Sequence, residues 1–226
     1  MSWLKRPEKK SSNPATKFLE WKSNDKCFAY YDKTKGENVQ VPLPLKFVIL
    51  EHYHTVRGWN DASESGIYSN EVLFTGSEEL EVKAFKGGLI AKGVYKEIKH
   101  KVNEAGGKYH RSIYAVTNEL EIINISLKGA SVREYSDFMS NNGDDSIFTK
   151  NWIEVKDVIE GKKGAVKYTS PKFSVGPKIK DASKLQPFAD TLQEYMIEYH
   201  NKGTNERVNS KVDEYIDEKE SDELAF

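Results

Sequence analysis

The last fourteen residues are the part of this 226-residue chain that most limits what can fold. Residues 213–226 hold seven carboxylates and one lysine, so the segment carries a net charge of −6. The whole chain carries −1, which leaves +5 on residues 1–212. Blocks of like charge stay solvated and resist compaction. We therefore expect residues 204–226 to form a disordered acidic tail on a basic folded body.

A phenylalanine at the very end of this acidic run is unexpected, because nothing in folding requires it there. One interpretation is that the tail only keeps the protein soluble, as acidic C-termini commonly do. The other is that Phe226 enters a pocket on a partner protein.

The rest of the chain has the composition of one domain. Apolar residues make up 38% of the sequence and charged residues 31%, which is enough for a core with a strongly hydrated surface. The longest aliphatic and aromatic run, residues 47–50, is too short to span a membrane. Lys5 and Arg6 precede polar residues, so no signal peptide is expected. The single cysteine, Cys27, excludes an internal disulfide and fits a reducing compartment.

The apolar pattern predicts a mostly β fold with added helices. Residues 1–22 are rich in lysine, serine and proline and are expected to be a flexible basic arm. Strands are expected at 26–32, 39–54, 67–74, 80–85, 109–117 and 120–127, with a turn at 33–36 and a loop at 57–65. Apolar residues at helical spacing predict a helix over 88–105. A capped helix at 131–143, a hairpin at 152–169 and a helix at 187–203 follow.

The order of these elements matches a five-stranded barrel of the OB type. Such a barrel carries its helix between strands three and four and holds oligonucleotides on one strand face and its flanking loops. Helix 88–105 falls in that position, and the C-terminal hairpin and helix would be additions. Residues 23–203 are therefore expected to be an OB-like nucleic-acid-binding domain. An open α+β sheet is the alternative.

The C-terminal tip, Asp222, Glu223, Leu224, Ala225 and Phe226, resembles the tip of bacterial and phage single-stranded DNA-binding proteins. Those tips read acid, acid, aliphatic, small residue and terminal phenylalanine, and alanine here takes the place of a proline in the bacterial tip. The resemblance covers only the tip and the acidic run before it.

This resemblance implies a sequence-independent single-stranded DNA-binding protein of replication, recombination or repair, encoded most plausibly by a phage. Its location would be the cytoplasm, or the host cytoplasm if a phage encodes it, with no membrane partner. The tail would occupy the DNA groove until DNA displaces it, and would then recruit replication or recombination proteins. A homo-oligomer is left open.

Candidate DNA contacts follow from aromatic and basic residues that alternate on strands, because rings stack on bases and cations neutralise phosphates. Residues 109–114 and the lysine-rich hairpin at 162–173 are the two main clusters, and a plain solvated basic face is the alternative for each. Tyr109 and Arg111 share one face of the strand, and Tyr114 lies on the other. Only one of these two faces is expected to be exposed to solvent. The full set is Phe28, Tyr30, Tyr53, Arg57, Trp59, Lys83, Phe85, Lys86, Tyr109, Arg111, Tyr114, Lys162, Lys163, Lys167, Tyr168 and Lys172.

No nucleotide-hydrolysing or zinc site is expected. The glycine spacing between Gly88 and Gly93 is followed by Val94 and Tyr95, not by the lysine and hydroxyl residue of a Walker motif. His52 and His54 share a strand face, but no cysteine cluster joins them.

A nuclease would need clustered carboxylates to hold metal ions. Asp144 and Asp145 follow a glycine turn, where such residues are common, and Glu154 and Asp157 are the other candidates. We therefore expect no enzyme and no metal or cofactor. The alternatives are a nuclease or accessory subunit of phage DNA metabolism, or a protein–protein adaptor without DNA affinity.

Overall fold

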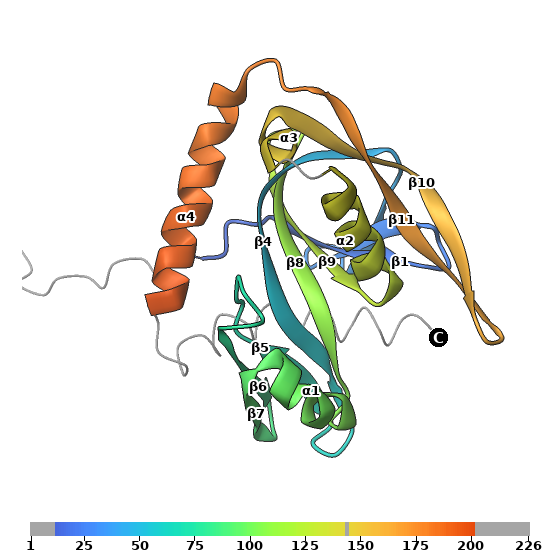
Figure 1. Ribbon diagram of the computed structural model, residues 1–226, viewed down its shortest axis with the longest axis vertical. Coiled ribbons are helices and arrows are strands. Elements are labelled where there is room, and N and C mark those ends of the chain that lie inside the picture. The colour runs from blue at the N-terminus through green and yellow to red at the C-terminus, as the bar shows by residue number, and fades with distance from the viewer. Residues whose placement is uncertain (1–11, 143–144, 202–226) are drawn as a thin grey trace, which may run out of the picture.

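A single eleven-stranded sheet organises the computed structural model, which describes residues 12–142 and 145–201. Neighbouring strands run in the order β3-β2-β1-β9-β8-β4-β5-β6-β7, and β10 joins β4 and carries β11 (Figure 1). The strands are β1 Lys17–Lys22, β2 Cys27–Asp32, β3 Glu37–Val41, β4 Leu45–Asn60, β5 Ser65–Ser69, β6 Glu79–Ala84, β7 Gly88–Val94, β8 Gly107–Thr117, β9 Ile122–Lys128, β10 Asn151–Lys163 and β11 Val166–Lys178.

The helices lie on both faces of this sheet. They are α1 Tyr95–Glu104, α2 Ala130–Asn142, α3 Asp145–Lys150 and α4 Gln186–Asn201, with a short 3-10 helix at Ala182–Leu185. Figure 1 shows α4 on the opposite side of β4 and β8 from α2, and α1 at the far end of these two strands.

Strand β4 is the centre of the sheet and connects its separate parts. One edge pairs with β8 from Phe47 to Gly58. The other edge pairs with β10 at its start, through Leu45 to Phe47, and with β5 at its end, through Arg57 to Asn60. The long hairpin β10–β11 is therefore held at one end of β4, and the β5–β7 meander at the other.

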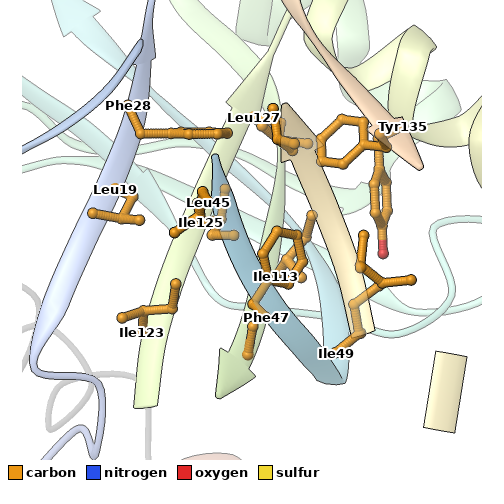
Figure 2. Close-up of a cluster of buried hydrophobic side chains, with 14 of the residues drawn as sticks. Leu19, Phe28, Leu45, Phe47, Ile49, Ile113, Ile123, Ile125, Leu127 and Tyr135 are labelled. Atoms are coloured by element: carbon orange, nitrogen blue, oxygen red, sulfur yellow. The ribbon is translucent and has the colours of Figure 1, made fainter. Parts of the chain in front are cut away.

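Three apolar clusters hold the elements together. The largest lies between the sheet and the layer formed by α2, α3 and the β10–β11 hairpin, and Figure 2 shows its fully buried aliphatic side chains meeting Phe28, Phe47 and Tyr135. The second packs α4 against the opposite face around Tyr114 and Val116. The third packs α1 against β5, β6 and β7. Fully burying one large apolar side chain contributes about 1.5–3 kcal/mol, so these clusters fix both faces of the sheet.

Much of the predicted secondary structure is confirmed. Strands β2, β6, β8 and β9, the hairpin β10–β11 and the helices α2 and α4 all lie where the sequence predicts them. The fold is mostly β with a minority of helix, as expected. The hairpin is longer than predicted, because the pairing of β10 with β11 extends from the turn to the pair Asn151 and Lys178.

The predicted helix at 88–105 is wrong in its first half. Residues Gly88–Val94 form β7, a hairpin partner of β6, and the helix begins at Tyr95. Ala91 and Gly93 are buried while Lys92 is exposed, which is a strand alternation. Ile90 and Val94 fit both the strand period and the helix period, so the apolar pattern alone does not separate the two.

The predicted flexible arm at 1–22 ends too late. Residues 17–22 form β1, which pairs with β2 and lies parallel to β9. Leu19 is 1% exposed in the largest apolar cluster, and burying it draws the segment into the sheet. The rest of the arm up to residue 11, and the predicted acidic tail at 204–226, lie outside the described residues.

The predicted five-stranded OB barrel is not confirmed. The sheet is open in the described part of the chain, since β3 and β7 stand at its two ends. The predicted strand 39–54 is divided by Pro42 and Pro44 into β3 and β4, and β4 continues to Asn60 through half of the predicted loop at 57–65. None of the described helices is long and apolar enough to cross a membrane.

Candidate nucleic-acid interface

A pocket of about 580 Å³ opens beside the ends of β1 and β9, next to the first turn of α2 and the tip of the β10–β11 hairpin. Its walls combine rings, cations and one carboxylate. The side chains that determine its chemistry are Glu20, Trp21, Lys128, Arg133, Lys163 and Tyr168.

Strand direction explains why the pocket lies at this point. Because β1 and β9 are parallel, their carboxyl ends lie at the same side of the sheet. Gly129 has a positive φ of 58°, which glycine adopts without strain, and it turns the chain from β9 directly into α2. Ala130 and Ser131, the first residues of α2, therefore line the pocket. The first backbone N–H groups of a helix lack intrahelical partners and favour negative charge.

The second wall is the hairpin, which hydrogen bonds attach to the end of β1. The Trp21 Nε1–H donates to the Thr169 carbonyl oxygen at 2.9 Å. The Thr169 N–H donates to the Ser23 Oγ at 2.7 Å, and its hydroxyl donates to the Ser23 carbonyl oxygen at 2.6 Å. These bonds fix the position of Tyr168, the residue before Thr169, at the pocket wall.

Gly161 makes room for the Tyr168 ring. The two residues are paired across the hairpin, and a Cβ on Gly161 would lie 2.3 Å from the ring carbon Cζ of Tyr168. The ring therefore occupies the space above the glycine. A side chain at position 161 would have to displace it.

The charge in the pocket is positive. Lys128, Arg133 and Lys163 are exposed cations, and Glu20 is the carboxylate among these lining residues. Burial raises the pKa of Glu20, but the charges of Lys128 and Lys22 outweigh it and hold this pKa below its ordinary value. Hydrogen bonding with Tyr168 raises the pKa of Arg133. At neutral pH the site thus presents three cations and one carboxylate, with two aromatic rings beside them.

A buried polar cluster continues from the pocket along the sheet. His110 pairs with the pocket residue Lys128 across β8 and β9. It is 4% exposed, and its Nδ1 lies 2.9 Å from the hydroxyl of Ser126, which also lines the pocket. Burial and the charge of Arg57 lower the pKa of His110 to about 3, so the ring is neutral at physiological pH.

A second half-buried surface lies on β8 and β4. The Arg111 Nη1–H donates to the Nε2 of His54 at 2.7 Å, and the His54 Nδ1 is hydrogen bonded to the Tyr109 hydroxyl. The Tyr109 ring lies 5.1 Å from the ring of Tyr95 on α1. Burial, Arg111 and His52 lower the pKa of His54 to about 4, so this histidine is neutral.

Four of the predicted DNA contacts are instead buried in the protein. Phe28 is fully buried in the largest apolar cluster, and Tyr53 and Tyr114 pack edge to face beneath α4. The Tyr114 hydroxyl donates to Glu71 at 3.2 Å. Arg57 is only 8% exposed. Because Tyr114 and Tyr109 point to opposite faces, the face of Tyr109 and Arg111 is the one that remains partly open.

The other predicted contacts are distributed over distant parts of the sheet. Lys162, Lys163, Lys167 and Lys172 are exposed on the hairpin, where Lys163 and Tyr168 reach the pocket. Tyr30 is half-buried on β2 with Lys17 over its ring. Trp59, Lys83, Phe85 and Lys86 lie around β4 to β7, where Lys83 pairs with Glu81 at 2.7 Å and Phe85 stacks on Tyr68. The structure does not bring this last group to the pocket.

Sequence reasoning missed Trp21, Lys128 and Arg133. Trp21 falls within the predicted flexible arm, and its parallel partner strand β9 lies about a hundred residues further along the chain. The strand-to-helix turn at Lys128 and Gly129, followed by a capped helix, is the local signal that could indicate an anion site.

The candidate carboxylates do not form a metal site in the described part of the chain. Glu154 is buried and pairs with Lys46 at 3.7 Å and with Lys156. Asp157 accepts a hydrogen bond from the backbone N–H of Val158. Asp144 lies outside the described residues. Among the residues that are described, no group of three histidine, cysteine or acidic side chains could hold a metal ion, and this includes the neighbourhood of His52 and His54.

Comparisons with known proteins give no match: no family model, no curated protein and no solved structure matches this chain.

Proposed function

We propose that this protein binds single-stranded DNA without reading its sequence, as a component of DNA replication, recombination or repair. The observation that carries the proposal is the pocket beside β1 and β9, which is lined by Lys128, Arg133 and Lys163 together with the rings of Trp21 and Tyr168. Phosphates require cations, and unstacked bases require aromatic surfaces. The pocket offers both within one concavity.

The mechanism is electrostatic attraction followed by stacking. The exposed lysines of the hairpin attract the strand, and the pocket cations and the first turn of α2 take its phosphate groups. Bases then stack on Tyr168 or Trp21, at about 1–3 kcal/mol for each stacked base. Every nucleotide has a phosphate and a ring face, so such binding tolerates any sequence. Duplex DNA, whose bases are already stacked, gains only the electrostatic part.

An OB barrel would use one strand face with its flanking loops for this task. In this proposal the strand ends of the open sheet, the start of α2 and the hairpin tip take that role. The acidic tail at residues 204–226 would compete with DNA for the cations and, once displaced, recruit replication or recombination proteins through Phe226. A tethered segment competes at an effective concentration on the order of millimolar.

A mobility-shift assay of the full chain tests the proposal. We expect oligothymidylate to be bound and an equal length of duplex to be bound more weakly, with the difference persisting when the sequence of the single strand is changed. Adding Mg²⁺ or Mn²⁺ should leave the oligonucleotide intact, whereas cleavage would favour the nuclease alternative. Absence of any shift at low salt would favour the adaptor alternative and overturn the proposal.

A further inference from the structure

Arg111 on β8 carries a charge that nothing in the described part of the chain neutralises. Its side chain is half-buried, and its Nε is buried without a hydrogen-bond partner. No ion pair of Arg111 is found among residues 12–142 and 145–201. Its hydrogen bond in this part of the chain goes to His54, at 2.7 Å from Nη1 to Nε2. The guanidinium is therefore held in place with its charge uncompensated.

The partner of Arg111 is a neutral acceptor, not an acid. His54 accepts from Arg111 at Nε2, so its proton lies on Nδ1, which is hydrogen bonded to the Tyr109 hydroxyl. The Glu51 carboxylate, three residues before His54 in the chain, accepts a hydrogen bond from the backbone N–H of His52 at 2.9 Å. Burying an unpaired charge is unfavourable, and a neutral partner leaves that cost in place. Such an arrangement is typical of an anion-binding site.

The position of Arg111 relates this site to the pocket. Arg111 is paired with Leu127 across β8 and β9, and Leu127 directly precedes the pocket residue Lys128. Neighbouring strands lie about 4.8 Å apart. Arg111 therefore lies one strand beyond β9 as seen from the pocket. Its side chain projects from the face of Leu127, where the pocket residue Trp21 also packs, and not from the face of Lys128. The hydroxyl of Tyr109 is hydrogen bonded to the same His54.

We propose that Arg111 is a second phosphate site, which binds a phosphodiester of the same strand beyond the nucleotide held in the pocket, while a base packs against Tyr109. His54 is the positioning residue that orients the guanidinium. This inference rests on the proposed function. An acidic peptide could also pair with a guanidinium. The phosphodiester is favoured because the neighbouring pocket supplies further cations and rings, which suit a polyanion that carries bases.

The test measures binding and stability of the full chain in four forms: wild type, Arg111→Gln, Arg111→Lys and the control Lys184→Gln. Lys184 is exposed on the 3-10 helix before α4, and its substitution removes the same charge elsewhere. Fluorescence anisotropy would use labelled oligothymidylates, a dinucleotide and a longer strand of about 12 nucleotides, which is within the usual range of site sizes. An acidic peptide of similar charge is the competing ligand.

We expect Arg111→Gln to weaken binding of the longer strand by about tenfold or more, since a hydrogen bond to a charged group is lost. The salt slope should become less negative by about 0.7. The dinucleotide, which fills only the pocket, should lose little affinity. The melting temperature should stay the same or rise, because an uncompensated charge is removed. Arg111→Lys should be intermediate, and Lys184→Gln should bind like the wild type.

Each contrary outcome has a separate meaning. Unchanged affinity with a lower melting temperature in Arg111→Gln would make Arg111 a structural residue and overturn the inference alone. An equal loss for both oligonucleotides would place Arg111 in the pocket itself and overturn a second site. Loss of peptide binding with DNA binding unchanged would assign the site to carboxylates. A wild-type protein that binds neither oligonucleotide would overturn the proposed function together with this inference.

Discussion

Two tyrosines on strands of this protein lie in different environments. Tyr168 lines the pocket together with Lys163, whereas Tyr114 is 1% exposed beneath α4, although the sequence predicts DNA contacts for all three residues. Both tyrosines lie on strands that also carry basic residues. The difference is which face a helix covers, and this depends on tertiary packing that a local pattern does not contain.

Tyr168 should contribute stacking energy and no charge. We expect Tyr168→Leu to weaken binding of oligothymidylate by about 1–3 kcal/mol, with an unchanged salt slope. Anisotropy titrations at several salt concentrations measure both quantities. If the affinity is unchanged while the melting temperature is preserved, this ring does not stack on a base.

The buried His110 and the half-buried His54 should make the fold sensitive to acid. The pKa of His110 is lowered to about 3 and that of His54 to about 4, against an ordinary value of 6.5. Between these values the unfolded chain binds more protons than the folded one, so acid favours unfolding. The contribution of these two histidines to the free energy of unfolding should be fully present above about pH 6.5 and should be lost as the pH decreases toward 3. Urea titrations at a series of pH values measure this.

His110→Gln is the matched variant for the pH dependence, because an amide can keep a hydrogen bond to Ser126 and does not titrate. It should flatten part of the pH dependence below 6.5. An identical pH profile in this variant and the wild type would contradict the assignment of a lowered pKa to His110.

The sequence predicts a helix or strand well where its apolar residues follow one period, and poorly where they fit both the helix period and the strand period. Helix α4 shows one clear period, with Leu192, Tyr195, Met196 and Tyr199 buried on one face, and its prediction is confirmed. The sequence pattern merges strand β7 with α1, because Ile90 and Val94 satisfy both periods. Strand β1 pairs with β2, its neighbour in the chain, but its other partner β9 is distant in sequence, and that pairing is decided by the whole fold. The pocket depends on β1, so it could not be predicted either.

The hairpin tip offers a test at the scale of an element. Gly161→Ala places a methyl group where the Tyr168 ring now lies, so the ring must move from the pocket wall. We expect a loss of affinity for single-stranded DNA similar to that of Tyr168→Leu, although neither a charge nor a ring has been removed. Gly164→Ala is a control at the same tip, since its Cβ would meet no atom within 4 Å, although its φ of 62° is strained for alanine.

The double variant Gly161→Ala with Tyr168→Leu tests whether the change at Gly161 acts through the Tyr168 ring. Its loss of affinity should be no larger than that of either single change, because both act through the same ring. Additive losses would mean that Gly161 acts independently of Tyr168.

At the scale of the whole molecule, the chain combines an open sheet, a basic pocket at its parallel strand ends and an acidic C-terminal segment. The separation of charge could be predicted from the sequence, because it depends only on the order of the charged residues along the chain. The open eleven-stranded order could not, since β4 pairs with β8 and β10 from distant parts of the chain as well as with its neighbour β5.

Removal of residues 213–226 should strengthen DNA binding, because a tethered segment of charge −6 no longer competes for the cations. Removal of Phe226 alone should leave this competition in place and abolish recruitment of a polymerase or helicase in a pull-down. A tail deletion that binds DNA no better than the wild type at low salt would exclude competition. Recruitment that persists without Phe226 would mean that the resemblance of the tip does not extend to function.

The central claim is that the pocket cations bind the phosphates of single-stranded DNA. The direct measurement is the salt dependence of oligothymidylate affinity for the wild type and for the triple variant Lys128→Gln, Arg133→Gln and Lys163→Gln. We predict a steep salt dependence for the wild type and a slope less negative by about 2 in the variant, since each phosphate that a cation neutralises accounts for about 0.7 of the slope. Equal slopes and affinities for the two proteins, with the fold intact, would contradict the account.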